Sequence, residues 1–83
     1  MKPGDMVMVQ ADAGLRAGYK AWPYCGDAIT PTRVIDRVDS STLGMVLDVK
    51  EVAMFGNDDL IEYVKVLLPG KVLWTIGFNT SKF

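Results

Sequence analysis

The chain begins with a tight turn that leads directly into an extended apolar segment. Pro3 restricts its own backbone φ, and Gly4 can adopt the positive φ that a type II turn requires. Residues 6–9 read Met-Val-Met-Val, an unbroken apolar run of the kind that forms a buried strand. Since successive side chains of a strand point to opposite faces, we expect both faces of this strand to be covered.

The strand signals form two blocks, residues 6–9 and the segments after residue 32, and an irregular stretch separates them. Glycines and prolines recur throughout residues 11–32, so we expect a long loop or arm there, which can include one turn of helix around residues 15–19. Gly44 indicates a bulge or a close backbone approach, and Pro69-Gly70 indicates a hairpin turn. The later expected strands are residues 34–38, 43–49, 61–67 and 72–76, with a last short strand or single turn in residues 78–83.

Short strands joined by tight turns, with one long loop near the start, are typical of a small barrel. We therefore predict an all-β fold, a small SH3-like barrel of about five strands with a long early loop. Because 83 residues is below the usual domain size of roughly 100 to 200 residues, we expect residues 1–83 to form a single domain.

Three short motifs resemble a group of known proteins. The motifs are Gly4-Asp5-Met6-Val7, Leu43-Gly44-Met45-Val46-Leu47, and Val64-Lys65-Val66-Leu67 followed by Gly70-Lys71 and Trp74. Together they resemble the small SH3-like barrel proteins encoded by tailed phages, over about half of the chain. The resemblance implies the barrel fold and a viral origin. It implies no activity, because one fold hosts many functions.

The composition bears on stability and on partners. A domain of this size has marginal stability unless a disulfide, a bound metal or association adds to it. Cys25 is the only cysteine, so no disulfide can form within the chain. Hydrophobic residues make up 49% of the chain, which favours self-association as the remaining source of stability. The net charge of −1, with both signs scattered, argues against nucleic acid as a partner.

Residues that could carry chemistry do not form a recognisable catalytic or metal-binding set. Cys25 lacks a histidine to act as its base, since the chain contains none, and it is better explained as a small apolar residue. The acidic residues Asp58, Asp59 and Glu62 lack the spacing of a calcium loop and are better explained as a solvated turn. We expect no enzyme activity, no cofactor and no metal.

Aromatic side chains are the candidates for a binding groove. The long early loop and the neighbouring hairpin loops of an SH3-like barrel can form a groove in which Tyr and Trp hold an extended peptide. The predicted ligand-binding residues are Tyr19, Trp22, Tyr24 and Phe55. The alternative is that these residues only pack within the domain, as we expect Tyr63 and Trp74 to do.

The strand at residues 6–9 suggests a second mode of contact. One small barrel has one interior, so the outward residues of this strand need another cover, and Met6 and Met8 are the predicted oligomer interface. We predict a non-enzymatic protein-interaction or structural module that associates with itself or with another protein. The alternative is a nucleic-acid-binding SH3-like barrel of the KOW type. With no signal-peptide core and no apolar stretch near the ~20 residues that span a bilayer, we expect a cytoplasmic protein, or a virion component if a phage encodes it.

Overall fold

The computed structural model describes residues 1–21, 29–53 and 60–83, and nearly all of the described secondary structure is strand. A single turn of 3-10 helix, η1 (Gly77–Asn79), precedes the last strand. The strands are β1 (Met6–Val9), β2 (Gly14–Arg16), β3 (Tyr19–Ala21), β4 (Ile29–Pro31), β5 (Val34–Arg37), β6 (Thr42–Ala53), β7 (Leu60–Leu68), β8 (Lys71–Ile76) and β9 (Thr80–Lys82). Among the described residues, no helix is long and apolar enough to cross a membrane.

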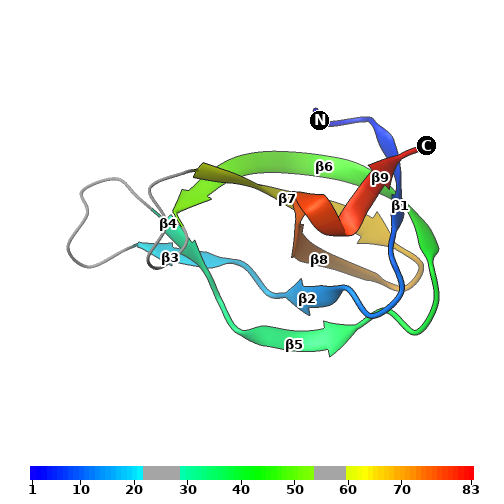
Figure 1. Cartoon of the computed structure of the whole chain (residues 1–83), viewed down its shortest axis with the longest axis horizontal. Helices are drawn as coiled ribbons and strands as arrows, with labels where there is room; N and C mark the ends of the chain where they lie inside the picture. Colours follow the sequence, from blue (N-terminus) through cyan, green and yellow to red (C-terminus); the bar gives the residue numbers. More distant parts are fainter. Residues whose placement is uncertain (22–28, 54–59) are drawn as a thin grey trace.

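Seven of these strands form one antiparallel sheet in the order β5-β2-β8-β7-β6-β1-β9. The sheet curls around an apolar interior into a half-barrel, while β3 and β4 pair with each other as a separate hairpin at one end (Figure 1). We call the concave side of the large sheet its inner face and the opposite side its outer face. The all-β fold class and the small barrel are thus confirmed.

The turn at the start of the chain has the expected backbone. Gly4 adopts a φ of +94°, and its N–H donates to the carbonyl of Val46 at 2.8 Å. The Asp5 N–H closes the turn on the carbonyl of Lys2 at 3.1 Å. The turn delivers β1 between β6 and β9, to which it pairs on its two sides, so the strand predicted for residues 6–9 is confirmed.

Residues 11–32 differ from the expectation of a loop with one helical turn. β2, β3 and β4 all lie within this stretch, and the predicted turn of helix at residues 15–19 is wrong. Leu15 is fully buried in the barrel interior, and Arg16 is the register partner of Trp74 on β8. β2 therefore forms because the distant strands β5 and β8 pair with it, although its own sequence has weak strand propensity.

The hairpin of β6 and β7 supplies most of the sheet. Gly44 makes the predicted close approach, because a Cβ there would lie 3.1 Å from the carbonyl oxygen of Leu67. The bulge lies instead between Val46 and Asp48, where β6 carries one extra residue against β7. The turn from β7 to β8 runs through Pro69 and Gly70, as predicted, and Gly70 adopts a φ of +76°.

Two apolar clusters lie on opposite faces of the sheet. The inner face holds the larger cluster, which fills the half-barrel with Val7, Val9, Ala13, Leu15, Val38, Val46, Val64, Val66 and Leu68. The smaller cluster lies on the outer face, at the end of the molecule near β3 and β4, and contains Val52, Tyr63, Trp74 and Ile76. The prediction that Tyr63 and Trp74 are core residues is confirmed, since both are buried.

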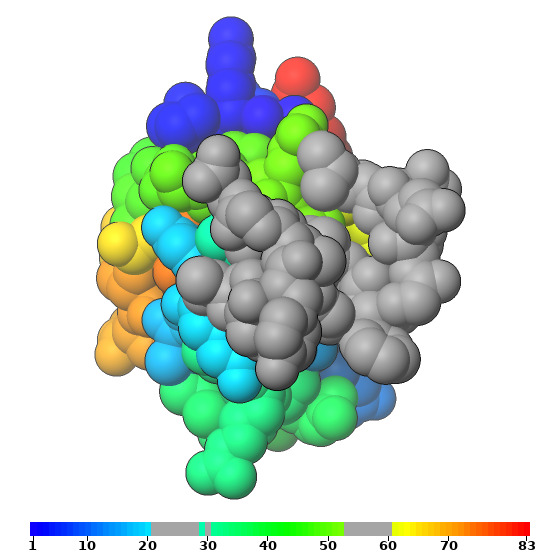
Figure 2. Space-filling view, turned by 90° about the vertical axis from the view of Figure 1, so that its left-hand side faces the viewer, coloured from blue at the N-terminus to red at the C-terminus, as the bar shows by residue number. Residues whose placement is uncertain are grey.

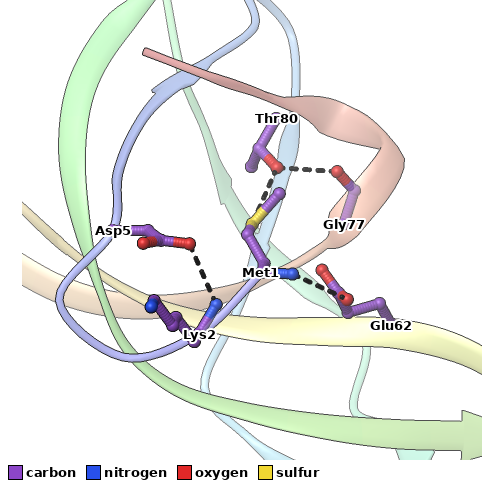
Figure 3. A network of polar contacts seen from close by, with 6 residues as sticks. All are labelled: Met1, Lys2, Asp5, Glu62, Gly77 and Thr80. Carbon is purple, nitrogen blue, oxygen red and sulfur yellow. Dashed lines mark hydrogen bonds and ion pairs between the residues drawn. The ribbon is translucent and has the colours of Figure 1, made fainter.

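The two ends of the chain meet beside β7. Figure 2 shows the first residues (blue) close to the last residues (red) at the top of the molecule, which agrees with the pairing of β1 with β9. The Met1 amine lies 3.5 Å from the carboxylate of Glu62 on β7, and the Thr80 hydroxyl donates to the Gly77 carbonyl at 2.7 Å (Figure 3). The same hydroxyl lies 3.6 Å from the Met1 sulfur. These contacts hold η1 and β9 against the start of the chain.

Candidate interaction surface

Strand β1 has apolar side chains on both faces, as its sequence predicts. Val7 and Val9 are fully buried in the inner cluster. Met6 and Met8 alternate with them and therefore lie on the outer face, where Met6 is exposed and Met8 is half-buried. The two predicted interface residues thus share one face, and that face is not the barrel interior.

The register of the sheet extends this apolar surface across four strands. Met6 on β1 is opposite Met45 on β6, Met45 is opposite Leu67 on β7, and Leu67 is opposite Val72 on β8. Opposite residues of an antiparallel pair share a face, so these four side chains form one row on the outer face. Leu67 is 43% and Val72 42% exposed, so solvent reaches the row.

Further apolar residues flank this row on both sides. Leu43, which is exposed, pairs with Met8 next to the row and borders a shallow hollow of about 500 Å³ between β1, β6 and the β7–β8 turn. Leu47, also exposed, is the extra residue of the β6 bulge. Beside Met6, the Phe83 N–H donates to the Met6 carbonyl at 3.0 Å, and the Phe83 side chain is exposed. We call the set of Met6, Leu43, Met45, Leu47, Leu67 and Val72 the outer apolar patch.

One acid and one base border the patch on the side toward the aromatic cluster. Asp48 and Lys65 are register partners on β6 and β7, and both are half-buried. Lys65 shares the outer face with Leu67, which is two residues further along β7. Within the described residues the structure shows no ion pair between Asp48 and Lys65, and the Asp48 carboxylate instead accepts the N–H of Val49 at 2.8 Å.

The other end of the outer face is covered by aromatic packing. The rings of Tyr63 and Trp74 are stacked with centroids 4.9 Å apart, and Tyr19 meets Trp74 edge-on at 5.4 Å. The Tyr63 hydroxyl donates to the carbonyl of Gly18 at the base of the β3–β4 hairpin. Burial raises the pKa of Tyr63 to about 12, because the ionised phenolate would lose its hydration there.

These contacts bear on the predicted aromatic groove. Tyr19 is 41% exposed, so one edge of its ring reaches solvent while the ring also packs on Trp74. The other three predicted groove residues, Trp22, Tyr24 and Phe55, lie outside the described residues. The groove therefore stays a prediction.

A second, more polar cleft of about 280 Å³ lies between residues 37–42 and the β7–β8 turn. Two cations line it, and both already hold partners. Arg37 donates to the Asp12 carbonyl at 3.0 Å, and Lys71 pairs with Asp36 at 2.8 Å. The hydrogen bond from Lys71 lowers the pKa of the Asp36 carboxyl. Asp36 therefore neutralises Lys71, whereas the partner of Arg37 is an uncharged carbonyl, so Arg37 keeps its positive charge at the cleft.

Residues with metal-binding or catalytic chemistry are dispersed in the described part of the chain. No three Cys, Asp or Glu side chains among residues 1–21, 29–53 and 60–83 come close enough to hold a metal ion. The surface feature with the most definite geometry is therefore the outer apolar patch.

Sequence reasoning identified only the β1 side of this patch. Leu67 and Val72 lie on strands that the sequence predicted, and alternation against Val66 and Leu73 is the signal that could have placed them on one face. Their alignment with Met6 depends on the register between strands, which alternation does not specify. No protein-family model, curated protein or solved structure matches this chain.

Proposed function

We propose that this protein is a non-enzymatic structural or interaction module that associates with a second copy of itself through the outer apolar patch. The observation that carries the proposal is the row of Met6, Met45, Leu67 and Val72. These side chains come from four adjacent strands and face solvent together. Contiguous exposed apolar patches on soluble proteins often mark contact sites.

A second copy of the chain can bury such a patch and leave no equivalent patch exposed. Two sheets that pack face to face lie about 10 Å apart and bury the apolar side chains between them. An isologous contact needs only one self-complementary patch, and closed two-fold symmetry limits further growth. The net charge of −1 adds little repulsion between two copies.

The chemistry of the surface also bears on the nucleic-acid alternative. A nucleic-acid barrel needs basic side chains gathered on one face to neutralise phosphates. The outer apolar patch instead carries aliphatic and thioether groups, and the charges at its border, Asp48 and Lys65, have opposite signs. This composition favours a protein partner.

Sedimentation velocity over a range of micromolar concentrations tests the proposal. The wild-type protein should form a dimer whose population rises with concentration, and Leu67→Lys should remain a monomer because the change buries an unpaired charge in the contact. Ile35→Lys is the matched control, since Ile35 is also an exposed apolar strand residue but lies on β5, outside the patch.

Two results would count against self-association. The first is a wild-type protein that stays monomeric over the whole concentration range while its circular dichroism shows a folded β protein. The second is equal dissociation of the dimer by Ile35→Lys and Leu67→Lys, which would place the contact elsewhere.

A further inference from the structure

The two charged residues at the border of the outer apolar patch carry an inference that rests on the proposed self-association. Asp48 and Lys65 lie opposite each other on β6 and β7, yet they form no ion pair with each other in the structure, which describes both residues. Val46 and Val49 pair with Val66 and Val64 of the inner cluster, so the bulge between them turns Leu47 and Asp48 to the outer face. Each charge is therefore half-buried and available to a partner.

The position of the two-fold axis decides what these charges meet when two patches pack face to face. An axis that runs along β6 places Asp48 against the partner's Asp48, and an axis along β7 places Lys65 against the partner's Lys65. Like charges that meet in an interface strongly oppose association. An axis that crosses the strands at the row of Met45 and Leu67 instead places Asp48 over the partner's Leu43, where it would lose hydration without gaining a counter-charge.

An axis parallel to the strands and midway between β6 and β7 avoids both penalties. It exchanges β6 of one copy with β7 of the other. Asp48 then faces the partner's Lys65, and Lys65 faces the partner's Asp48. In the same arrangement Met45 faces the partner's Leu67, so the apolar row is buried as well.

We propose that the homodimer is built around this axis, with Asp48 and Lys65 forming two reciprocal ion pairs across the interface. The apolar row supplies the burial, and the ion pairs set the orientation of the two copies. Charges at the border of an interface typically determine register and partner choice more than total affinity. The β3–β4 hairpins of both copies lie at the same end of the assembly in this arrangement, beyond the ion pairs.

Charge reversal provides a test that depends on this geometry. Asp48→Lys makes both border positions positive, and Lys65→Asp makes both negative. Each variant alone should show a dimer dissociation constant at least about tenfold weaker than that of the wild type. An equimolar mixture of the two variants should form a heterodimer, detected by native mass spectrometry, because both ion pairs are restored, one with the wild-type polarity and one with the polarity reversed.

Two further measurements keep the test informative if a reversal variant folds poorly. The double variant Asp48→Lys with Lys65→Asp should recover the homodimer. The wild-type dimer should also weaken somewhat as sodium chloride is raised, because salt screens ion pairs at the border of an interface, although less than fully exposed pairs, whereas it does not screen apolar contacts. Thermal melts monitored by circular dichroism establish which variants are folded.

The outcomes separate this inference from the proposed function. If the wild type forms a dimer but both reversal variants dimerise equally well, or if folded variants fail to form the heterodimer, the reciprocal ion pairs are refuted and self-association stands. A wild type that is monomeric at every concentration refutes both.

Discussion

At the residue scale, the aromatic stack decides how one end of the outer face is closed. Trp74 packs against both Tyr63 and Tyr19, and the Tyr63 hydroxyl reaches the Gly18 carbonyl where the β3–β4 hairpin joins the barrel. Aromatic pairs in such geometry add about 0.5 to 1.5 kcal/mol beyond the area they bury. The stack therefore links the hairpin to β7 and β8, and it leaves the outer apolar patch as the open part of this face.

Tyr63 should give the protein a specific loss of stability at alkaline pH. Its pKa is about 12 in the folded chain against an ordinary value of 10.0. Above pH 10 the unfolded chain loses the phenolic proton first, so the free energy of unfolding falls as pH rises toward 12. Urea unfolding at a series of pH values measures this decrease, and Tyr63→Phe should show a shallower one. Equal slopes for the two proteins would contradict the assignment.

At the element scale, β1 separates two kinds of residue, since its valines are buried in the barrel and its methionines lie on the outer face. Its inner valines pack in the barrel, its outer methionines border or belong to the exposed face, and the strand lies between β6 and β9. A change of charge at adjacent positions should therefore have different consequences, since the inner position is enclosed within one chain and the outer position would be covered only in the proposed dimer.

Val7→Lys should unfold the barrel, because it places an unpaired charge in a fully buried position. Met8→Lys should leave the chain folded and weaken self-association, because Met8 lies on the outer face next to Leu43. Circular dichroism and sedimentation velocity on both variants decide the question. A Met8→Lys protein that is unfolded, or a Val7→Lys protein that keeps its melting transition, would show that the faces have been assigned incorrectly.

At the scale of the whole molecule, we expect stability to come from packing within the chain and from the proposed self-association. The sequence contains a single cysteine and no histidine, so a disulfide within the chain and a histidine-bound metal are both excluded by composition. The seven-stranded sheet is open between β5 and β9, which do not pair with each other. Burial of the outer apolar patch in a dimer adds apolar area that one chain of this size lacks.

The melting temperature should therefore be insensitive to both a chelator and a thiol reductant. It should rise instead with protein concentration, because a dimer is favoured by mass action. Differential scanning calorimetry at several concentrations, with and without each additive, measures all three effects. A melting temperature lowered by the chelator would point to a metal, and one lowered by the reductant would point to a disulfide between chains.

Local chemistry determined much of the fold. The Pro3-Gly4 and Pro69-Gly70 turns, the alternation along β1, and the strands at β6, β7 and β8 follow from backbone preferences and a two-residue period, which are properties of a few neighbouring residues. The same alternation placed Met6 and Met8 opposite the buried valines. Local chemistry was misleading for residues 11–32, where glycines and prolines suggested a loop although β2 pairs with β5 and β8.

Only the tertiary structure decided which outer residues meet. Met6, Met45, Leu67 and Val72 come from separate strands, and their alignment depends on the register of three strand pairs. The bulge at Leu47 then turns Asp48 toward the outer face opposite Lys65. Register is set by the packing of the whole inner face, since a slip of one residue would turn every inner side chain outward. The patch and its charged border are consequences of that packing, which a pattern within one strand does not contain.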